Sequence, residues 1–277
     1  MKPLPRVLPA LITPFDRDGT VDDNAHRHNL EVLVSRGAQG FLIAGSTGQG
    51  PYLLQGQRHR LVGVGRKALG PDSFLLCGVQ AESVDQAINQ IEEAIDGGAD
   101  ALLLMTPTSL VRGNDELVAL FYRTVADAVP LPVFLYSVPS TTGYELPVAV
   151  AVDLATHPDI VGMKDSGGDT ERIPGLTADA QFLVLAGSSR ALHQSFASGA
   201  HGAITASANY AYELVVEALQ DDGAQQRLAT LAGVVEGFGL AGTYAAAEEV
   251  GLITGTMRLP LTPLGGNDRD AVKALVS

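Results

Sequence analysis

The chain has 277 residues, a formal net charge of −13 and an apolar fraction of 46%. This acidity argues against a surface that binds nucleic acid or an anionic membrane. Pro3, Pro5 and Pro9 interrupt the N-terminus, so we expect no signal peptide there, and no uninterrupted run reaches the ~18 apolar residues of a membrane span. The single cysteine, Cys77, excludes an internal disulfide and fits a reducing compartment. We therefore expect a cytoplasmic protein that binds neither nucleic acid nor a membrane.

Short apolar runs recur along the chain, and each leads into a longer amphipathic segment. They span residues 7–15, 40–45, 73–79, 101–107, 132–138, 160–166, 182–188 and 202–207. Most are continuously apolar, which is typical of strands buried on both faces of a parallel sheet. Their spacing, mostly about 20 to 35 residues, matches one βα unit. Eight consecutive units favour a (β/α)8 TIM barrel over an open doubly wound sheet.

The chain stays helical in pattern after the eighth run. Residues 210–277 contain more helix than the last barrel repeat needs, and no linker separates them from the rest. We therefore predict a single domain over 1–277. Its barrel strands and most of its helices lie within 1–209, and 210–277 supply the last barrel helix and a C-terminal helical extension.

Unusual polar residues stand at the ends of several runs. They are Ser46 and Thr47 after the second run, Tyr136 in the fifth, Lys164 to Ser166 in the sixth, and Gly187 to Ser189 at the end of the seventh. In TIM barrels, chemistry gathers at the C-terminal ends of the strands. We therefore expect these residues at one rim.

Lys164 is one of only four lysines, and it ends an apolar run. Period-two alternation places Ile160, Gly162 and Lys164 on one face of a strand. If that face lines the barrel, burial favours the neutral amine, which attacks carbonyl groups and forms Schiff bases. The alternative is a structural lysine that extends to the rim or pairs with Asp165.

Two further groups near Lys164 suit this chemistry. Tyr136 lies on the neighbouring run at similar depth, and a buried phenol beside an amine can shuttle protons; the alternative is a core tyrosine. The backbone N–H groups of the 45–48 segment can hold a carboxylate, although Gly and Ser are also ordinary turn residues.

Other chemistries find no support in the sequence. The six histidines show no metal-ligand spacing, and neither a P-loop nor a dinucleotide-binding glycine motif is present. Cys77 lies in the middle of an apolar run and is expected in the core. We expect no metal and no nucleotide.

These motifs, in this order, resemble the family of pyruvate-dependent class I aldolases and synthases that includes dihydrodipicolinate synthase and N-acetylneuraminate lyase. The resemblance runs from ALITPF through GSTGQGPYLL, YSVPSTTG, IVGMKDSGGD and LAGSSRAL to GAITASAN and RLPLTPL. It implies that Lys164 forms a Schiff base with pyruvate or a pyruvate-yielding 2-oxo acid, without a cofactor. Tyr136 would be the general acid/base, with Thr47 in its proton relay.

The same resemblance implies the binding residues. Ser46 and Thr47, with their backbone N–H groups, would hold the pyruvyl carboxylate, and the main chain at Gly187 and Ile204 would line the pocket. A homotetramer or homodimer is implied as well.

Within the family, YSVPSTTGYELP and HPDIVGMKDSGGD most resemble 4-hydroxy-2-oxoglutarate aldolases. Such an enzyme cleaves its substrate to pyruvate and glyoxylate, and Ser166 would contact the bound intermediate. The alternatives are a 2-keto-3-deoxy sugar-acid aldolase, a dihydrodipicolinate synthase-like enzyme, a dehydratase that uses the same Schiff base, and a weakly catalytic or non-catalytic protein that binds pyruvate.

The chain departs from the family pattern at four places. Residues 139–143 lack the arginine with which dihydrodipicolinate synthases clamp a second carboxylate, and residues 106–110 lack the tyrosine that reaches a neighbouring subunit's relay. Gln49 replaces a glutamate. Arg190 follows two serines where sialic acid lyases carry acidic residues. We hypothesise that Arg190 pairs with a second substrate carboxylate; the alternative is a solvated arginine at a helix start.

Overall fold

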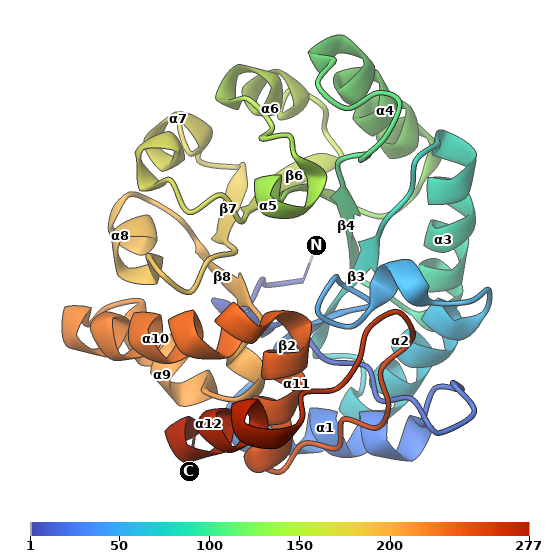
Figure 1. Ribbon diagram of the computed structural model, residues 1–277. Coiled ribbons are helices and arrows are strands. Elements are labelled where there is room, and N and C mark those ends of the chain that lie inside the picture. The colour runs from blue at the N-terminus through green and yellow to red at the C-terminus, as the bar shows by residue number, and fades with distance from the viewer. Residues whose placement is uncertain (1, 277) are drawn as a thin grey trace.

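Eight parallel strands form a barrel with helices packed around it (Figure 1). The computed structural model describes residues 2–276. The strands are β1 (Val7–Pro9), β2 (Gly40–Ile43), β3 (Phe74–Val79), β4 (Ala101–Met105), β5 (Val133–Ser137), β6 (Ile160–Asp165), β7 (Leu183–Ala186) and β8 (Gly202–Thr205). Each lies within one of the eight apolar runs, so the predicted TIM barrel is confirmed.

Strand order closes the barrel. The sheet runs β1-β8-β7-β6-β5-β4-β3-β2, and every neighbouring pair is parallel. A bridge between Ala10 and Leu42, with the Leu11 N–H donating to the Leu42 carbonyl at 2.9 Å, joins β1 to β2.

The predicted strand over 7–15 is too long. Beyond Leu11 the backbone makes no further bond to a neighbouring strand, and side chains from the C-terminal third accept from its N–H groups instead. The Ile12 N–H donates to Asn209 Oδ1 at 3.1 Å, and the Thr13 N–H donates to the Tyr244 hydroxyl at 3.1 Å.

Helices follow the strands and cover the outside of the barrel (Figure 1). Polar caps start several of them; the Ser83 hydroxyl, for example, accepts from the Gln86 N–H. The α-helices of the barrel are α1 (Asp23–Ser35), α2 (Gln57–Leu69), α3 (Val84–Gly97), α4 (Asp115–Ala128), α5 (Pro139–Thr142), α6 (Val148–Leu154), α7 (Ile173–Leu176), α8 (Leu192–Ala197) and α9 (Tyr212–Ala218). Short 3-10 helices are η1 (Gly50–Tyr52), η2 (Thr170–Arg172) and η3 (Ser207–Asn209).

Two apolar layers separate the inside of the barrel from its outer wall. Residues such as Leu8, Leu76, Phe134 and Leu185 fill the interior, whereas a larger cluster packs the sheet against the helices. The interior is a packed core that leaves room for chemistry only at its ends.

A β-bulge in β6 corrects one sequence-based prediction. Val133 pairs with Ile160, but the next residue, Phe134, pairs with Gly162, so Val161 is an extra residue. Ile160 therefore packs in the outer layer, while Lys164 stands beside Tyr136 of the interior layer. The prediction that Ile160 shares the face of Lys164 was wrong, because strict alternation does not continue through a bulge.

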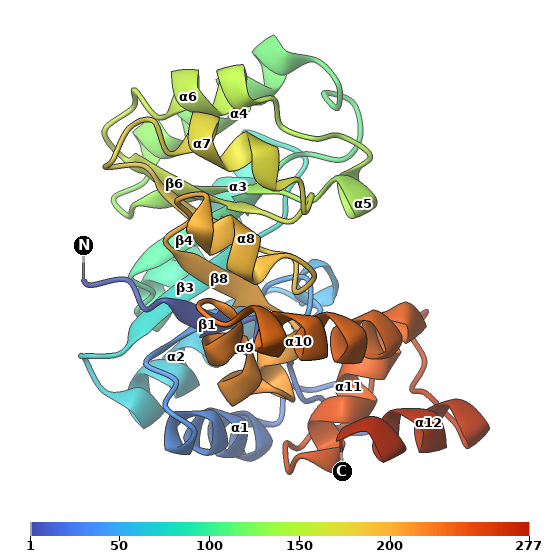
Figure 2. The ribbon, with the colours of Figure 1, turned by 90° about the vertical axis from the view of Figure 1, so that its left-hand side faces the viewer.

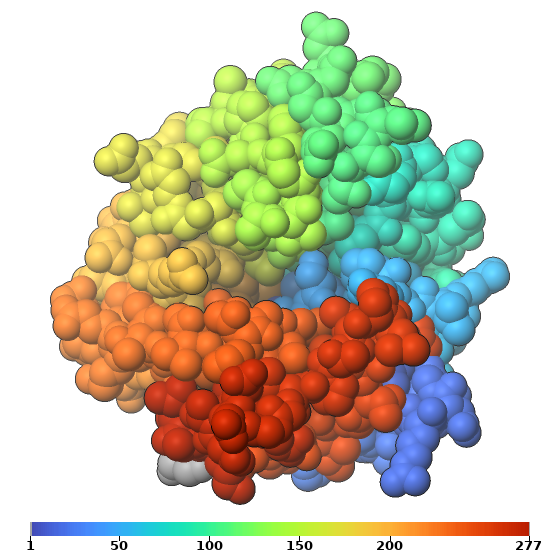
Figure 3. Space-filling model, viewed as in Figure 1, coloured from blue at the N-terminus to red at the C-terminus, as the bar shows by residue number. Residues whose placement is uncertain are grey.

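The C-terminal extension consists of α10 (Asp222–Val235), η4 (Glu236–Phe238), α11 (Gly239–Glu249) and α12 (Gly266–Val276). It reaches the end of the barrel at which α5 lies, away from the N-terminus (Figure 2). In the space-filling view it crosses this face of the molecule as a broad orange and red band (Figure 3).

One stretch of the extension is long and apolar enough to cross a membrane, if only its length and composition are considered. Asp222–Glu249 has 28 residues and a mean hydropathy of 1.2 in its most apolar 18-residue window. It is not one straight helix, because η4 and Gly239, at φ 66° and ψ −152°, interrupt it. Several of its apolar residues, including Leu228, Val235 and Ala246, are fully buried within the protein. Within residues 2–276, 39% of this 18-residue window is buried in the protein, and one such stretch is weak evidence of a membrane span.

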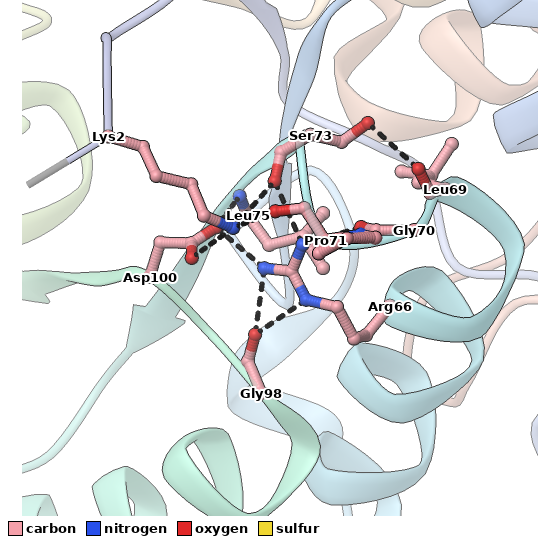
Figure 4. A network of polar contacts seen from close by, with 9 residues as sticks. All are labelled: Lys2, Arg66, Leu69, Gly70, Pro71, Ser73, Leu75, Gly98 and Asp100. Atoms are coloured by element: carbon pink, nitrogen blue, oxygen red, sulfur yellow. Dashed lines mark hydrogen bonds and ion pairs between the residues drawn. The ribbon is translucent and has the colours of Figure 1, made fainter.

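A polar network joins the beginnings of β3 and β4 (Figure 4). Asp100 contacts Lys2 Nζ at 2.7 Å and Arg66 Nη2 at 2.6 Å, and it accepts from the Leu75 N–H at 2.8 Å. Arg66 also donates to the Gly98 carbonyl. The network lies at the N-terminal ends of the strands, where barrels place residues for stability.

Candidate active site

Lys164 and Tyr136 meet inside the barrel. They are register partners on β6 and β5, and Lys164 Nζ donates to Tyr136 Oη at 3.3 Å. The ammonium nitrogen also lies 4.4 Å from the centroid of the Tyr136 ring. Lys164 is 6% exposed and Tyr136 is 4% exposed. The structure therefore brings together the amine and the phenol that the sequence singled out.

The phenol of Tyr136 ionises more readily than its burial suggests. Burial alone would raise its pKa, but the charge and hydrogen bond of Lys164, with the nearby hydroxyls of Ser166 and Ser46, outweigh burial. The net effect is a pKa below the ordinary value. A phenol of this kind is suited to accept and return protons.

Asp165 does not pair with Lys164. Its carboxylate accepts from Arg172 Nε at 3.1 Å and from the Gly167 N–H at 2.9 Å. Arg172 in turn binds Glu145 Oε2 at 2.7 Å and the Leu146 carbonyl at 2.6 Å. This partly buried network fixes the end of β6, and it removes the alternative in which Asp165 neutralises the lysine.

Two buried hydroxyls near Tyr136 lack partners. Ser46 Oγ and Ser166 Oγ are shielded from solvent, and neither makes a well-formed hydrogen bond within residues 2–276. Both nevertheless favour ionisation of the Tyr136 phenol. Buried polar groups are rarely left unpaired without a functional reason, so these hydroxyls are available for a ligand.

The segment after β2 also offers backbone donors. Ala44 has a φ of 56°, the left-handed conformation, and it turns the chain sharply into Ser46 and Thr47. Among the described residues, the N–H groups of Ser46 and Thr47 donate to no acceptor. Such free N–H groups can bind a carboxylate without a cation.

Ser46 and Thr47 are not equivalent in the structure. Ser46 is close enough to Tyr136 to influence its pKa. The Thr47 carbonyl accepts from Tyr244 at 3.2 Å, and no hydrogen bond links the Thr47 hydroxyl to Tyr136 in the described part of the chain. The contacts favour Ser46 as the relay hydroxyl, so the relay role of Thr47 stays a prediction without structural support.

Gly187 and Ile204 line the same region. A Cβ at Gly187 would overlap Ser166 Oγ and would lie 2.9 Å from Lys164 Cε, so only glycine fits there. Ile204 belongs to the interior cluster that contains Tyr136. Their main-chain contacts with pyruvate remain predictions.

Sequence reasoning missed Glu236. It lies on η4, where its Oε1 accepts from Ser189 Oγ at 3.4 Å. Its carboxylate is within electrostatic range of both Arg190 and Lys164. Arg190 itself is exposed, and its N–H donates to Ser188 Oγ at 3.4 Å. The only local signal of Glu236 was one acidic residue in the apolar run LAGVVEGFGL.

Glu82 organises the loop in which the family tyrosine is absent. Its carboxylate accepts from the N–H groups of Thr108 and Ser109 at 2.9 to 3.1 Å, and from both hydroxyls at 2.5 Å. The next residue, Leu110, is 98% exposed. Within residues 106–110, the Thr106 hydroxyl donates to the Tyr136 carbonyl at 3.2 Å, but no side chain of this segment, as described, bonds to the Tyr136 hydroxyl.

Gln49, which replaces a family glutamate, is buried, and both its amide nitrogen and its amide oxygen make hydrogen bonds. Its Nε2 donates to the Tyr244 hydroxyl at 2.8 Å, and its Oε1 accepts from the Arg258 N–H at 2.9 Å. The amide therefore ties the segment after β2 to the C-terminal extension. A carboxylate could not donate the first of these bonds.

Within residues 2–276, no three His, Cys, Asp or Glu side chains are grouped to hold a metal ion. Cys77 is fully buried in the core, and burial raises the pKa of its thiol to about 12. The prediction that Cys77 is a core residue is confirmed.

Known sequences match this chain over nearly its whole length. The Dihydrodipicolinate synthetase family model matches residues 3–277. A 4-hydroxy-tetrahydrodipicolinate synthase of Methanothrix thermoacetophila is 32% identical over 284 residues, which cover 98% of this chain and 95% of the relative. An uncharacterized DapA-like lyase of Halobacterium salinarum is 33% identical over 280 residues, which cover 97% of this chain and 91% of the relative.

Solved structures agree with these relatives. A chloride-inhibited dihydrodipicolinate synthase from Acinetobacter baumannii, complexed with pyruvate, superposes with a TM-score of 0.90 at 29% identity; 97% of this chain and 96% of that chain are covered. Dihydrodipicolinate synthase DapA-2 of Bacillus anthracis gives a TM-score of 0.91 at 24% identity and covers 100% and 98%, which is a likeness of fold.

Proposed function

Because the chain belongs to the dihydrodipicolinate synthetase family, whose members are aldolase-type carbon–carbon lyases, we propose that it cleaves a 4-hydroxy-2-oxo acid through a Schiff base on Lys164. The observation that carries this proposal is the buried contact between Lys164 Nζ and Tyr136 Oη at 3.3 Å. An amine inside an apolar barrel, beside a phenol with a lowered pKa, is equipped to form and use an imine.

The reaction follows from these two groups. The neutral amine of Lys164 attacks the C2 carbonyl, and the Tyr136 phenol donates its proton to the carbinolamine hydroxyl, which leaves as water and gives the protonated imine. Tyr136, as phenolate, removes the proton of the C4 hydroxyl. The C3–C4 bond then breaks, its electron pair moves into the imine to give an enamine, and an aldehyde leaves. Protonation of C3 and hydrolysis release pyruvate and regenerate Lys164.

The unpaired donors near Lys164 provide a place for the carboxylate of the 2-oxo acid. The backbone N–H groups of Ser46 and Thr47 have no other acceptor among the described residues, and the hydroxyls of Ser46 and Ser166 are buried and unpartnered. Anion binding by such groups needs no formal positive charge. This suits a chain with a net charge of −13.

The motifs around β5 and β6 favour 4-hydroxy-2-oxoglutarate as the substrate, with glyoxylate as the aldehyde. The absence of an arginine from residues 139–143 disfavours the synthase activity that gives the Methanothrix relative its name. Arg190 is the candidate partner for the second carboxylate in this proposal. A 2-keto-3-deoxy sugar acid is the second candidate, because Glu236 lies near Arg190 and would accept hydrogen bonds from sugar hydroxyls.

Borohydride reduction in the presence of pyruvate tests the imine. We expect a mass increase of one reduced pyruvyl group, located on Lys164 by peptide mapping. Lys164→Arg should give no adduct, because a guanidinium stays protonated, while Lys67→Arg should label like the wild type. Absence of any adduct in the wild type would refute the Schiff-base mechanism.

Tyr136→Phe separates proton transfer from packing. The variant keeps a ring beneath Lys164 Nζ but loses the hydroxyl, so we expect kcat for cleavage to fall by about 100-fold with the fold intact. Assays of pyruvate and of glyoxylate, with each candidate acid, measure both the rate and the product. An unchanged kcat would remove Tyr136 from the mechanism.

A further inference from the structure

Glu236 belongs to the extension, yet it lies beside the strand ends of the barrel. It begins η4, directly after α10. The extension lies at the same end of the barrel as α5, away from the N-terminus (Figure 2), and α5 directly follows the strand that carries Tyr136. The extension therefore adds a side chain to a site that is otherwise built from barrel segments.

Buried hydrogen bonds fix the position of Glu236 relative to the segment after β7. Gln225 of α10 is 3% exposed; its Nε2 donates to the Ser189 carbonyl at 3.0 Å, and its Oε1 accepts from the His193 N–H at 3.0 Å. The Ser189 hydroxyl contacts Ser207 Oγ at 2.8 Å and Glu236 Oε1 at 3.4 Å. One end of α10 is thus attached to the segment that follows β7, and Glu236 is fixed near it.

The carboxylate of Glu236 retains binding capacity. Within residues 2–276, Oε1 has only the long contact with Ser189, and Oε2 has no hydrogen-bond or ion-pair partner. A carboxylate can accept several hydrogen bonds.

The charged and titratable groups around Glu236 come from three elements. Lys164 and Arg190 act on it from β6 and from the segment after β7, and the phenol of Tyr210, which follows η3, is also within electrostatic range. Burial raises the pKa of Glu236, although Ser189, Arg190 and Lys164 act in the opposite direction. None of these contacts neutralises the side chain through an ion pair of 4 Å or less within the described residues.

We propose that Glu236 is a substrate-binding residue that accepts a hydrogen bond from a hydroxyl on the aldehyde half of the substrate and disfavours a carboxylate in the same place. Its Oε1 contacts Ser189, two residues after Gly187, and a Cβ at Gly187 would lie 2.9 Å from Lys164 Cε, so Glu236 belongs to the segment that borders the imine-forming lysine. An anionic acceptor there selects hydroxyl donors and repels a second carboxylate. This inference rests on the proposed aldolase function, and within it Glu236 favours the 2-keto-3-deoxy sugar acid over 4-hydroxy-2-oxoglutarate, the substrate that the motifs around β5 and β6 favour.

The test compares kcat/KM for a 2-keto-3-deoxy sugar acid with kcat/KM for 4-hydroxy-2-oxoglutarate. In Glu236→Gln, the contact with Ser189 is kept and the charge is lost. We expect the ratio of the two kcat/KM values to shift toward the dicarboxylate by about tenfold or more. Glu217→Gln, which removes an exposed carboxylate on α9, should leave the ratio unchanged.

Borohydride trapping of pyruvate distinguishes failure of the Glu236 proposal from failure of the aldolase proposal. It should remain at the wild-type level in Glu236→Gln, because pyruvate has no aldehyde half. Normal trapping with an unchanged ratio would overturn the role of Glu236 and leave the aldolase proposal intact. Failure of trapping in the wild type would overturn the aldolase proposal itself. If Glu236→Gln is poorly folded, Glu236→Asp replaces it, and a ratio equal to that of the wild type, despite the shortened side chain, would overturn the role.

Discussion

Ser46 and Thr47 are consecutive hydroxyl residues with different environments. Ser46 Oγ is buried without a partner and favours ionisation of Tyr136, whereas Thr47 offers its backbone to Tyr244 and to a ligand. Both residues lie in a turn that follows β2, in which the Gln49 N–H donates to the Ser46 carbonyl at 3.0 Å. Sequence similarity could assign a hydroxyl to the relay, but only the contacts distinguish the two.

We predict that Ser46→Ala lowers kcat for cleavage by about tenfold or more, because the phenol of Tyr136 loses a neighbouring hydroxyl. Thr47→Val should leave kcat within about threefold of the wild type, since its N–H remains in place. Steady-state kinetics of pyruvate release would measure both. The reverse order of effects would return the relay role to Thr47.

At the scale of the element, α1 carries a buried histidine. His26 is 1% exposed, and burial lowers its pKa to about 4. The folded protein therefore keeps His26 neutral below pH 6.5, where the unfolded chain would protonate it. The unfolded state binds more protons in this range, so stability falls as the pH drops from about 6.5 to about 4.

We predict that His26 contributes a loss of about 2.5 kcal/mol in unfolding free energy between pH 7.5 and pH 4.5. In His26→Leu, the stability measured by urea unfolding should decrease less over the same interval. His59→Gln, a change at an exposed histidine of α2, should keep the dependence of the wild type. Parallel curves for His26→Leu and the wild type would contradict this prediction.

At the scale of the whole molecule, the extension is part of the site. The Tyr244 hydroxyl of α11 contacts the backbone of Thr13 and Thr47 and the side chain of Gln49. Asn209 of η3 binds the backbone of Ala10 and Ile12. These contacts join the ends of β1, β2 and β8 to the C-terminal third, so changes in the extension should alter the catalytic rim.

The predicted homo-oligomer gives a test at the same scale. Glu82 fixes the loop that presents Leu110, which is 98% exposed. If this loop contacts a second copy, Leu110→Glu should lower the mass measured by sedimentation, because a charge would be buried at an apolar contact. Leu259→Glu, at another exposed leucine, is the control. An unchanged mass for Leu110→Glu would place the contact elsewhere.

The sequence by itself determined the barrel, its eight strands and the pairing of Lys164 with Tyr136. These features rest on local signals: continuously apolar runs, their regular spacing, and single polar residues at strand ends. The bulge at Val161 escaped this reasoning, because an inserted residue leaves no mark in an apolar run.

Only the tertiary structure decided which groups surround the amine. Three of these relationships depend on three-dimensional packing. Asp165 binds Arg172, Ser46 lies close to Tyr136, and Glu236 contacts Ser189 after β7. Glu236 stands 72 positions after Lys164 (236 minus 164), and no periodicity connects them. The physical reason is that strand formation follows from local pattern, whereas the electrostatic surroundings of a buried group are set by whichever segments pack against it.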